Sequence, residues 1–532
     1  MESKNKKESL KLGKKPLTLE ELREVAIFGR KAMLAPAAVN KIKKANRFLL
    51  ERVRSGETLY GVNTGFGLLS NVRIPDEEIE TLQYNLLRSH AVGVGAYLSD
   101  DVVRAMLLLR AWNLAIGHSG VRLELVEIIL SLLNRGVCPL IPEQGSVGAS
   151  GDLAPLSHLA LVLIGEGRAR VRGKVMSGAQ ALRAAGLKPI RLGPKEGLAL
   201  INGTQFMTAI GALNLLEAER LCDVADAVGA MTVEAMRGTE TAFEEEIHAV
   251  RPHPGQIQSA SNVRRFLLSG GGKSEIALSH ENCGKVQDPY SLRCIPQVHG
   301  ASRDVLTFVR GVLEREINSV TDNPLVFPDQ GRILSGGNFH GQIVAIAMDA
   351  LSIAVAEIAS ISEQRIEKLV NPAISELPAF LTRQGGLNSG FMIIQVAAAA
   401  IVSENKTLAH PASVDSIPTS ADKEDHVSMG AWAARKARMI VTNAKRVMAM
   451  ELLSSAQAID LLRPLKSSEV LERIHQRVRK RVRFAEVDRS YHDDLIWLES
   501  FVGSDELAGI LDEALSEARL VRKSAVRRKK TR

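Results

Sequence analysis

The feature that most constrains this fold is a pair of long segments without glycine or proline. One runs from Gln342 to Asn371 and the other from Ala431 to Arg463, and both are rich in Ala, Ile, Leu, Met, Glu and Arg. These residue types favour helices, and about 30 residues would form a helix about 45 Å long. Helices of this length pack against partners within a bundle or across subunits. The segments therefore predict a mainly α-helical protein with a long central bundle.

Composition excludes several other classes of protein. Of the 532 residues, 45% are hydrophobic and 24% are charged, which is close to globular averages and argues against a disordered chain. The basic N-terminus is followed by no apolar core of signal-peptide length. The longest apolar stretch, Phe391 to Val402, is shorter than the roughly 20 residues that a membrane span needs. We therefore expect a cytoplasmic protein without membrane association.

The formal net charge of +8 is concentrated at the two ends of the chain. Residues 1–15 carry a net charge of +4, and residues 519–532 hold eight basic residues and no acidic one, which leaves a net charge of −4 for residues 16–518. We expect two flexible basic tails. Between them we expect an N-terminal domain over residues 16–205 and a long-helix bundle with a C-terminal helical region over residues 206–518. No nucleic acid is required by this charge distribution.

General site motifs are missing from the sequence. The twelve histidines are dispersed, so no metal site is predicted. No phosphate-binding GxxxxGK[ST] loop and no dinucleotide-binding glycine pattern occurs. The sequence therefore predicts no nucleotide cofactor.

The most unusual segment is GSVGASGD, at residues 145–152, where three glycines surround a serine. Glycines permit tight bends, and such a bend brings the nitrogen of Gly151 against the carbonyl carbon of Ala149. Cyclisation with loss of water and dehydration of Ser150 would then give a 4-methylidene-imidazol-5-one (MIO) ring. The alternative is a loop before a helix that begins near Asp152, with Ser150 or Asp152 as its cap. On the tripeptide alone the loop is the favoured interpretation.

The wider context reverses this preference. Seven motifs, in order, resemble those of the histidine and aromatic amino-acid ammonia-lyases, and the resemblance runs from about Leu17 to about Arg463. They are YGVNTGFG (Tyr60–Gly67), GSVGASGDLAPLSH (Gly145–His158), NGTQ (Asn202–Gln205), KVQDPYSLRC (Lys285–Cys294), TDNPLVF (Thr321–Phe327), SGGNFHG (Ser335–Gly341) and SENKTLAHPASVDSIPTSA (Ser403–Ala421).

The resemblance implies the fold, the prosthetic group and the assembly. It implies a ring-bearing N-terminal helical domain and a long central bundle, the architecture of the fumarase/aspartase-like superfamily. It also implies an MIO electrophile made from Ala149, Ser150 and Gly151, with Ser150 becoming a dehydroalanine, and no external cofactor. Members of the family are homotetramers whose active sites combine loops of different subunits.

Further roles follow from the resemblance, position by position. Tyr60 matches the base for the β-proton, and Tyr290 and Gln287 match polar groups that stabilise charge as the C–N bond breaks. Three other positions match substrate-binding groups: Arg293 for the substrate carboxylate, Asn202 near the ring and that carboxylate, and Phe339 in the pocket wall.

Two positions bear on which amino acid is deaminated. His90, within a Ser-His pair, and Glu424 are similar to the residues of the histidine-specific members, whereas aromatic lyases carry Phe-Leu or His-Leu and a glutamine there. An imidazole and a carboxylate suit a substrate ring with polar nitrogens, so L-histidine is the expected substrate and urocanate the expected product. The family's Ala-Asn-Gln before this glutamate is replaced by Ala421-Asp422-Lys423. We expect these two neighbouring charges to alter the protonation of Glu424 or the loop that carries it, and so the preference for one substrate over another.

Two alternatives remain open at this point. The first is a tyrosine or phenylalanine ammonia-lyase or aminomutase of the same family, which His90 allows and Glu424 disfavours. The second is a helical nucleic-acid-binding protein or an inactive scaffold, which would require none of Ser150, Tyr60 and Arg293.

Overall fold

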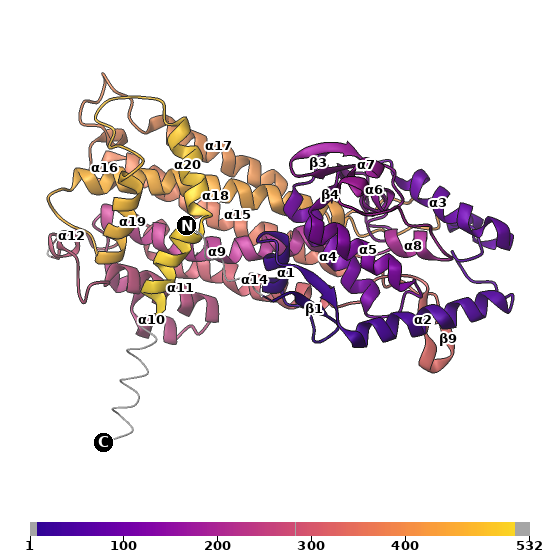
Figure 1. Ribbon diagram of the computed structural model, residues 1–532. Coiled ribbons are helices and arrows are strands. Elements are labelled where there is room, and N and C mark those ends of the chain that lie inside the picture. The colour runs from indigo at the N-terminus through magenta and orange to yellow at the C-terminus, as the bar shows by residue number, and fades with distance from the viewer. Residues whose placement is uncertain (1–7, 282, 517–532) are drawn as a thin grey trace. The chain divides into compact units, whose positions relative to one another are not determined.

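The computed structural model describes residues 8–281 and 283–516, which divide into two compact units (Figure 1). The first unit comprises Met1–Leu213, Arg310–Asp349 and Pro411–Arg435, and the second comprises Asn214–Val309, Ala350–His410 and Lys436–Arg532. The chain therefore returns to the first unit twice after leaving it. The predicted domains, residues 16–205 and 206–518, were consecutive segments and so differ from these units. The predicted tail over residues 519–532 lies outside the described residues.

Long helices dominate the structure, as predicted. Four of them contain the boundaries between the units: α9 (Gln205–Ala235), α14 (Ile295–Glu316), α15 (Gln342–Val370) and α18 (Gly430–Leu461). The last two coincide with the two segments that lack glycine and proline, so the mainly α-helical fold class is confirmed.

The remaining elements of the first unit are short helices and strands. They are β1 (Leu10–Leu12), α1 (Leu19–Ala26), β2 (Ala32–Leu34), α2 (Pro36–Arg54), η1 (Gly67–Asn71), η2 (Asp76–Glu78), α3 (Ile79–His90), β3 (Val94–Tyr97), α4 (Asp100–Ala115), α5 (Leu123–Arg135), β4 (Val137–Pro139), β5 (Pro142–Gln144), α6 (Ala154–Leu163), β6 (Arg168–Val171), β7 (Lys174–Ser177), α7 (Gly178–Ala184), α8 (Glu196–Ile201), β8 (Leu325–Phe327), η4 (Pro328–Gln330) and β9 (Arg332–Leu334).

The second unit is helical throughout its described elements. They are η3 (Glu240–Phe243), α10 (Glu245–Ala249), α11 (Pro254–Leu267), α12 (Glu275–Leu278), α13 (Tyr290–Arg293), α16 (Pro372–Ser375), η5 (Ala379–Leu381), α17 (Met392–Leu408), α19 (Glu469–Arg479) and α20 (His492–Val502), followed by helical residues 505–516. Within this unit α11 packs against α10 and α19 (Figure 1).

The strands of the first unit form small sheets: β1 with β2 in parallel, and the antiparallel sets β3-β5, β4-β6-β7 and β8-β9. The first of these bears on the expected N-terminal tail over residues 1–15. Residues 1–7 lie outside the described part, but Leu10 and Leu12 are buried, 5% and 2% exposed, where β1 pairs with β2. Two alternating leucines therefore anchor the chain well before residue 15.

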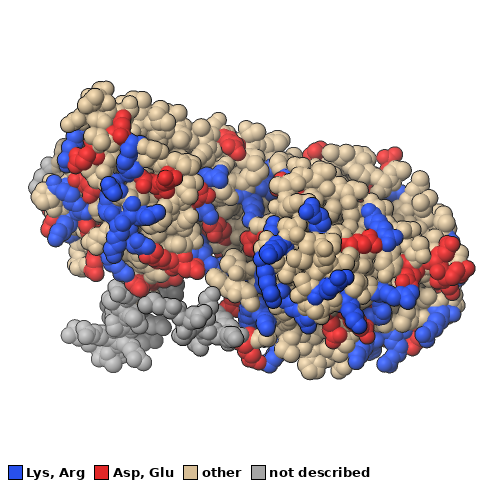
Figure 2. All heavy atoms as spheres, turned by 45° about the horizontal axis from the view of Figure 1, so that its top comes forward, with Lys and Arg blue, Asp and Glu red and all other residues tan. Residues whose placement is uncertain are grey.

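Charged side chains of both signs are interspersed on the visible face of each unit (Figure 2). Many form ion pairs across the surface, such as Arg88 with Glu166 and Arg477 with Glu506. Among the described residues one helix, α15, is long and apolar enough to cross a membrane by length and composition, and 61% of its apolar window is buried inside the protein.

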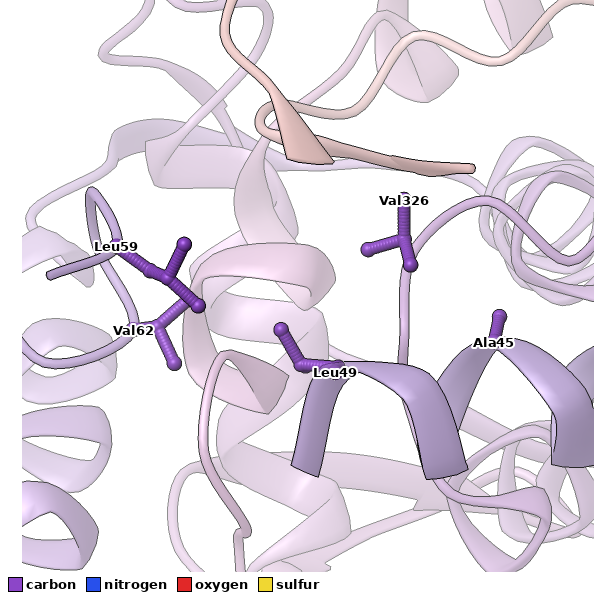
Figure 3. Close-up of a cluster of buried hydrophobic side chains, with 5 residues drawn as sticks. All are labelled: Ala45, Leu49, Leu59, Val62 and Val326. Carbon is purple, nitrogen blue, oxygen red and sulfur yellow. The ribbon is translucent and has the colours of Figure 1, made fainter. Parts of the chain in front are cut away.

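A cluster of apolar side chains holds the segment around Tyr60 in place (Figure 3). It joins Ala45 and Leu49 of α2, Leu59 and Val62 on either side of Tyr60, and Val326 of β8. Each is at most 6% exposed. The buried face of α2 therefore helps to hold the loop of Tyr60 in place.

We predict that Leu49→Ala lowers the free energy of unfolding by about 2–5 kcal/mol, because it removes a fully buried side chain and leaves a cavity. Chemical denaturation measures this loss. Val175→Ala, at a side chain that is 44% exposed, is the control and leaves stability nearly unchanged. Equal stability of the two variants would contradict the role of the cluster.

Candidate functional site

The loop that contains Ser150 has a backbone conformation that requires glycine at two positions. Gly148 and Gly151 have φ angles of +70° and +77°. A Cβ atom on Gly148 would lie 2.3 Å from Ser428 Oγ, and one on Gly151 would lie 2.2 Å from the carbonyl oxygen of Gly203. The loop is therefore clamped on both sides, and both glycines are required by space as well as by backbone conformation.

Hydrogen bonds complete the clamp. Ser428 Oγ donates to the carbonyl oxygen of Gly148 at 3.0 Å, and the amide of Met429 donates to the carbonyl oxygen of Val147 at 2.9 Å. On the other side the amide of Asp152 donates to the carbonyl oxygen of Gly203 at 2.8 Å. Segments far apart in the sequence thus fix the loop from residue 147 to residue 152.

Asp152 is a functional residue whose role the sequence did not show. Its carboxylate is fully buried and accepts the amides of Phe206 at 2.5 Å and Met207 at 3.3 Å, so it caps α9. The alternative interpretation of this segment, in which Ser150 or Asp152 caps the helix directly after it, is wrong, because α6 begins at Ala154 and its N-cap, Leu153, makes no side-chain cap. Burial raises the pKa of Asp152 to about 7, against the lowering effect of the two amides.

Arg110 of α4 is a second residue that the sequence analysis missed. Its guanidinium is fully buried and donates to the carbonyl oxygens of Ala199 at 2.5 Å and Asn202 at 2.9 Å, and also to the side chain of Gln205. Burial lowers its pKa to about 10, and nearby carboxylates oppose this effect. Arg110 is the one charged residue in the otherwise apolar run from Ala105 to Trp112 of α4, and this was the available signal.

Two predicted site residues, Asn202 and Glu424, are brought to Ser150. Asn202 Nδ2 donates to the carbonyl oxygen of Ser150 at 2.9 Å, and Ser150 Oγ donates to Glu424 Oε1 at 2.8 Å. Asn202 is only 4% exposed, and its Oδ1 has no hydrogen-bond partner among the described residues. This buried acceptor, beside the serine, is available to a ligand.

The turn before Glu424 has an uncommon backbone. Ser420, Ala421 and Asp422 have φ angles of 53°, 52° and 61°, and left-handed residues cost roughly 1–2 kcal/mol each. Asparagine and aspartate tolerate this region best among side chains with a Cβ, so Asp422 suits the position where the family carries Asn. Lys423 is exposed, and its amide donates to the carbonyl oxygen of Ser420 at 3.3 Å.

His90 stands at the C-terminal end of α3 and interacts electrostatically with Glu424. Its Nδ1 lies 2.9 Å from the carbonyl oxygen of Leu86, which only accepts, so Nδ1 carries the proton and Nε2 is left as an acceptor. Burial lowers the pKa of His90, an effect that the Leu86 carbonyl and Glu424 oppose. Burial therefore favours the neutral form of the ring.

Tyr60 and Phe339 lie on loops that meet the Glu424 segment. The amide of Gly67 donates to Tyr60 Oη at 3.4 Å, and a Cβ on Gly67 would lie 3.9 Å from Ser420 Cβ. Phe339 is half-buried and no hydrogen bond or ring contact joins it to Ser150 in the described part of the chain. Its neighbour His340 stacks on His426, with ring centroids 6.0 Å apart.

The other three predicted site residues lie in the second unit: Gln287 just before α13, Tyr290 at its first residue and Arg293 at its last. Arg293 places its guanidinium carbon 4.5 Å from the ring centre of Tyr290 and donates from Nε to the carbonyl oxygen of Asp288 at 3.0 Å. Tyr290 is 70% exposed, and Gln287 is exposed as well. Arg293 and Tyr290 are thus in contact, whereas the side chain of Gln287 is exposed near them in the sequence.

In residues 8–281 and 283–516, no group of three or more His, Cys, Asp or Glu side chains is placed to hold a metal ion.

Comparison with known proteins identifies the family of this chain. The sequence profile described as "Aromatic amino acid lyase" matches residues 17–480. The chain belongs to this family. A protein of Anaeromyxobacter sp. (strain K) named histidine ammonia-lyase is 55% identical over 504 residues, covering 93% of this chain and 98% of its own length. As a member of this family, the present chain is a carbon–nitrogen lyase.

Solved structures of relatives share its fold. A crystal structure of histidine ammonia-lyase from Trypanosoma cruzi superposes with a TM-score of 0.88 at 45% identity, over 95% of this chain and 96% of that one. A tyrosine aminomutase from Streptomyces globisporus gives a TM-score of 0.89 at 37% identity, over 95% and 99% of the two chains. The family thus combines one helical fold with different reactions.

We predict that the pH dependence of stability reflects Asp152. Its pKa is about 7 in the folded chain and near the ordinary 3.8 in the unfolded chain, so the folded state keeps a proton that the unfolded state has released. The free energy of unfolding, relative to that of Asp152→Asn, falls as the pH rises from about 4 to about 7. Denaturation of both proteins at several pH values measures this, and parallel curves would refute it.

Proposed function

We propose that the chain eliminates ammonia from L-histidine to give trans-urocanate, using an MIO ring made from Ala149, Ser150 and Gly151. The observation that carries this proposal is the position of Ser150, clamped in a glycine-rich loop between Asn202 and Glu424. Relatives at 50–55% identity named histidine ammonia-lyase support the choice of substrate.

The residues around Ser150 fit such a ring. Gly151 approaches the backbone of Gly203 so closely that a Cβ has no space, and Asn202 holds the carbonyl of Ser150 while its Oδ1 remains unpaired. Once formed, the ring supplies an electrophile that activates the substrate for loss of its amine. Asn202 and the clamp of Ser428 and Gly203 would hold it in place.

The chain's own side chains bind and orient the substrate. Glu424 accepts the N–H of the substrate imidazole, and His90 lies beside the same ring. Tyr60 Oη takes the β-proton. Arg293 pairs with the substrate carboxylate through its planar guanidinium, and Gln287 and Tyr290 stabilise the charge that develops as the amine leaves. Phe339 contributes apolar surface beside them.

We propose that these groups complete a site in a homotetramer. Exposed apolar side chains on two long helices support association: Ile343, Ile346 and Ile353 of α15 and Ile393 and Val396 of α17 are 44–64% exposed. The exposed Tyr290 and Gln287 would then meet substrate at a site shared between subunits. Location in the cytoplasm stays a prediction.

The mass of the intact protein tests ring formation. We expect a mass two water molecules below that of the encoded chain, with the loss confined to residues 149–151. Ser150→Ala should lose activity while it keeps its helical circular dichroism, because only the reactive side chain is removed. An unmodified wild-type mass, or full activity of Ser150→Ala, would overturn the proposal.

A substrate panel tests the choice of amino acid. We expect kcat/KM for L-histidine to exceed that for L-tyrosine and L-phenylalanine by on the order of 10⁴-fold, because a phenyl or phenol ring leaves the buried polar groups unpaired. Absorbance of urocanate, cinnamate and coumarate measures each reaction. Coumarate or a β-amino acid as the main product would instead support a tyrosine lyase or an aminomutase.

A further inference from the structure

The carboxylate of Glu424 uses its two oxygens differently. Oε2 accepts from Thr419 Oγ1 at 2.8 Å and from Ser420 Oγ at 2.7 Å, whereas Oε1 accepts only from Ser150 Oγ, at 2.8 Å, among the described residues. An ionised carboxylate has two lone pairs on each oxygen, so two hydroxyls occupy those of Oε2.

The left-handed turn makes this arrangement possible. Thr419 and Glu424 exchange two backbone hydrogen bonds, from the amide of Thr419 to the carbonyl of Glu424 at 3.0 Å and in reverse at 3.3 Å. The left-handed residues between them close the loop on itself, which brings both hydroxyls back to the carboxylate. Backbone strain of this kind persists where surrounding contacts over-determine it, and it concentrates at functional sites.

Formation of the ring changes the surroundings of only one of these oxygens. Ser150 loses its hydroxyl: the Cβ–Oγ bond breaks, the Cα proton departs, and Oγ leaves as water. Oε1 then loses the donor that it has in the unprocessed chain, whereas Oε2 keeps both of its hydroxyls. The vacated lone pair on Oε1 lies on the side of residue 150, where the substrate would bind.

We propose that Thr419 and Ser420 are positioning residues, which occupy Oε2 of Glu424 and thereby present Oε1 to the imidazole N–H of the substrate. This inference rests on the proposed function. Without the two hydroxyls the carboxylate is free to rotate about its terminal torsion, which is broad in glutamate, and it no longer offers one fixed acceptor.

Thr419→Val and Ser420→Ala test this proposal, since each removes a hydroxyl with little change of volume. We expect each variant to raise KM for L-histidine by about tenfold with kcat within about threefold, because the lost hydrogen bond orients a group that binds substrate and transition state alike. Thr419→Ser and Ser420→Thr keep a hydroxyl and should restore KM. Thr442→Val is the matched control, because Thr442 donates only to the carbonyl of Arg438, and it should leave KM unchanged.

A double-mutant cycle separates positioning through Glu424 from a merely structural effect. In a Glu424→Ala background the Thr419→Val change should have no further effect on KM, whereas independent effects would multiply. Multiplying effects, or an unchanged KM in both single variants, would overturn the inference.

The intact mass completes the test. All the variants should show the same loss of two waters as the wild type, and an unmodified mass in Thr419→Val or Ser420→Ala would place the hydroxyls in ring formation and overturn the positioning role. Failure of the wild type to convert L-histidine would instead refute the proposed function itself.

Discussion

The buried carboxylate of Asp152 is the interaction on which the rest of the site depends. It caps the 31-residue helix α9 from a loop of another segment, and its own amide is bound by Gly203. Gly151 and Gly203 are in backbone contact beside Asp152. The start of α9 and the reactive loop are therefore held in a fixed position relative to each other. Arg110 also fixes the turn before α9, because its guanidinium donates to the carbonyl oxygen of Asn202. Removal of any one of these groups would leave another buried polar group without a partner.

Buried charges fix the helices of the second unit in a similar way. Arg365 of α15 and Glu451 of α18 are both fully buried and pair at 2.5 Å. Asp226 of α9 accepts from His299 at 2.8 Å and from Arg303 at 2.6 Å. Burial alone would raise the pKa of Asp226, but Arg303 and His299 outweigh it and bring the value to about 2. Such pairs contribute little net stability, but breaking one is costly, so they favour one register of the helices.

The sequence predicted the helices and several site residues, and failed where tertiary contacts decide. Runs of helix formers identified α15 and α18 because no glycine or proline interrupts them, and motif resemblance placed Asn202 near the ring. The resemblance assigned Glu424 to the substrate imidazole and did not predict its contact with Ser150. Spacing alone could not show that Asp152 caps a helix that begins about 50 residues later, since that pairing depends on how the chain folds back. The anchoring of Leu10 was missed for a related reason, because three residues are too few to display a strand pattern.

The clamp on the reactive loop also sets an order of events during synthesis. Ser428, which binds the carbonyl of Gly148, follows it by 280 residues in the chain. At typical elongation rates of about 5–20 residues per second, that separation corresponds to roughly 15–60 s on the ribosome. The nascent chain therefore lacks the Ser428 side of the clamp during that time, although Gly203 on the other side is already made, and the complete geometry around Ser150 is reached only after residue 428 has emerged. A polypeptide released before that point would have only the Gly203 side of the clamp, so the fully clamped loop depends on a segment about 280 residues further along the chain.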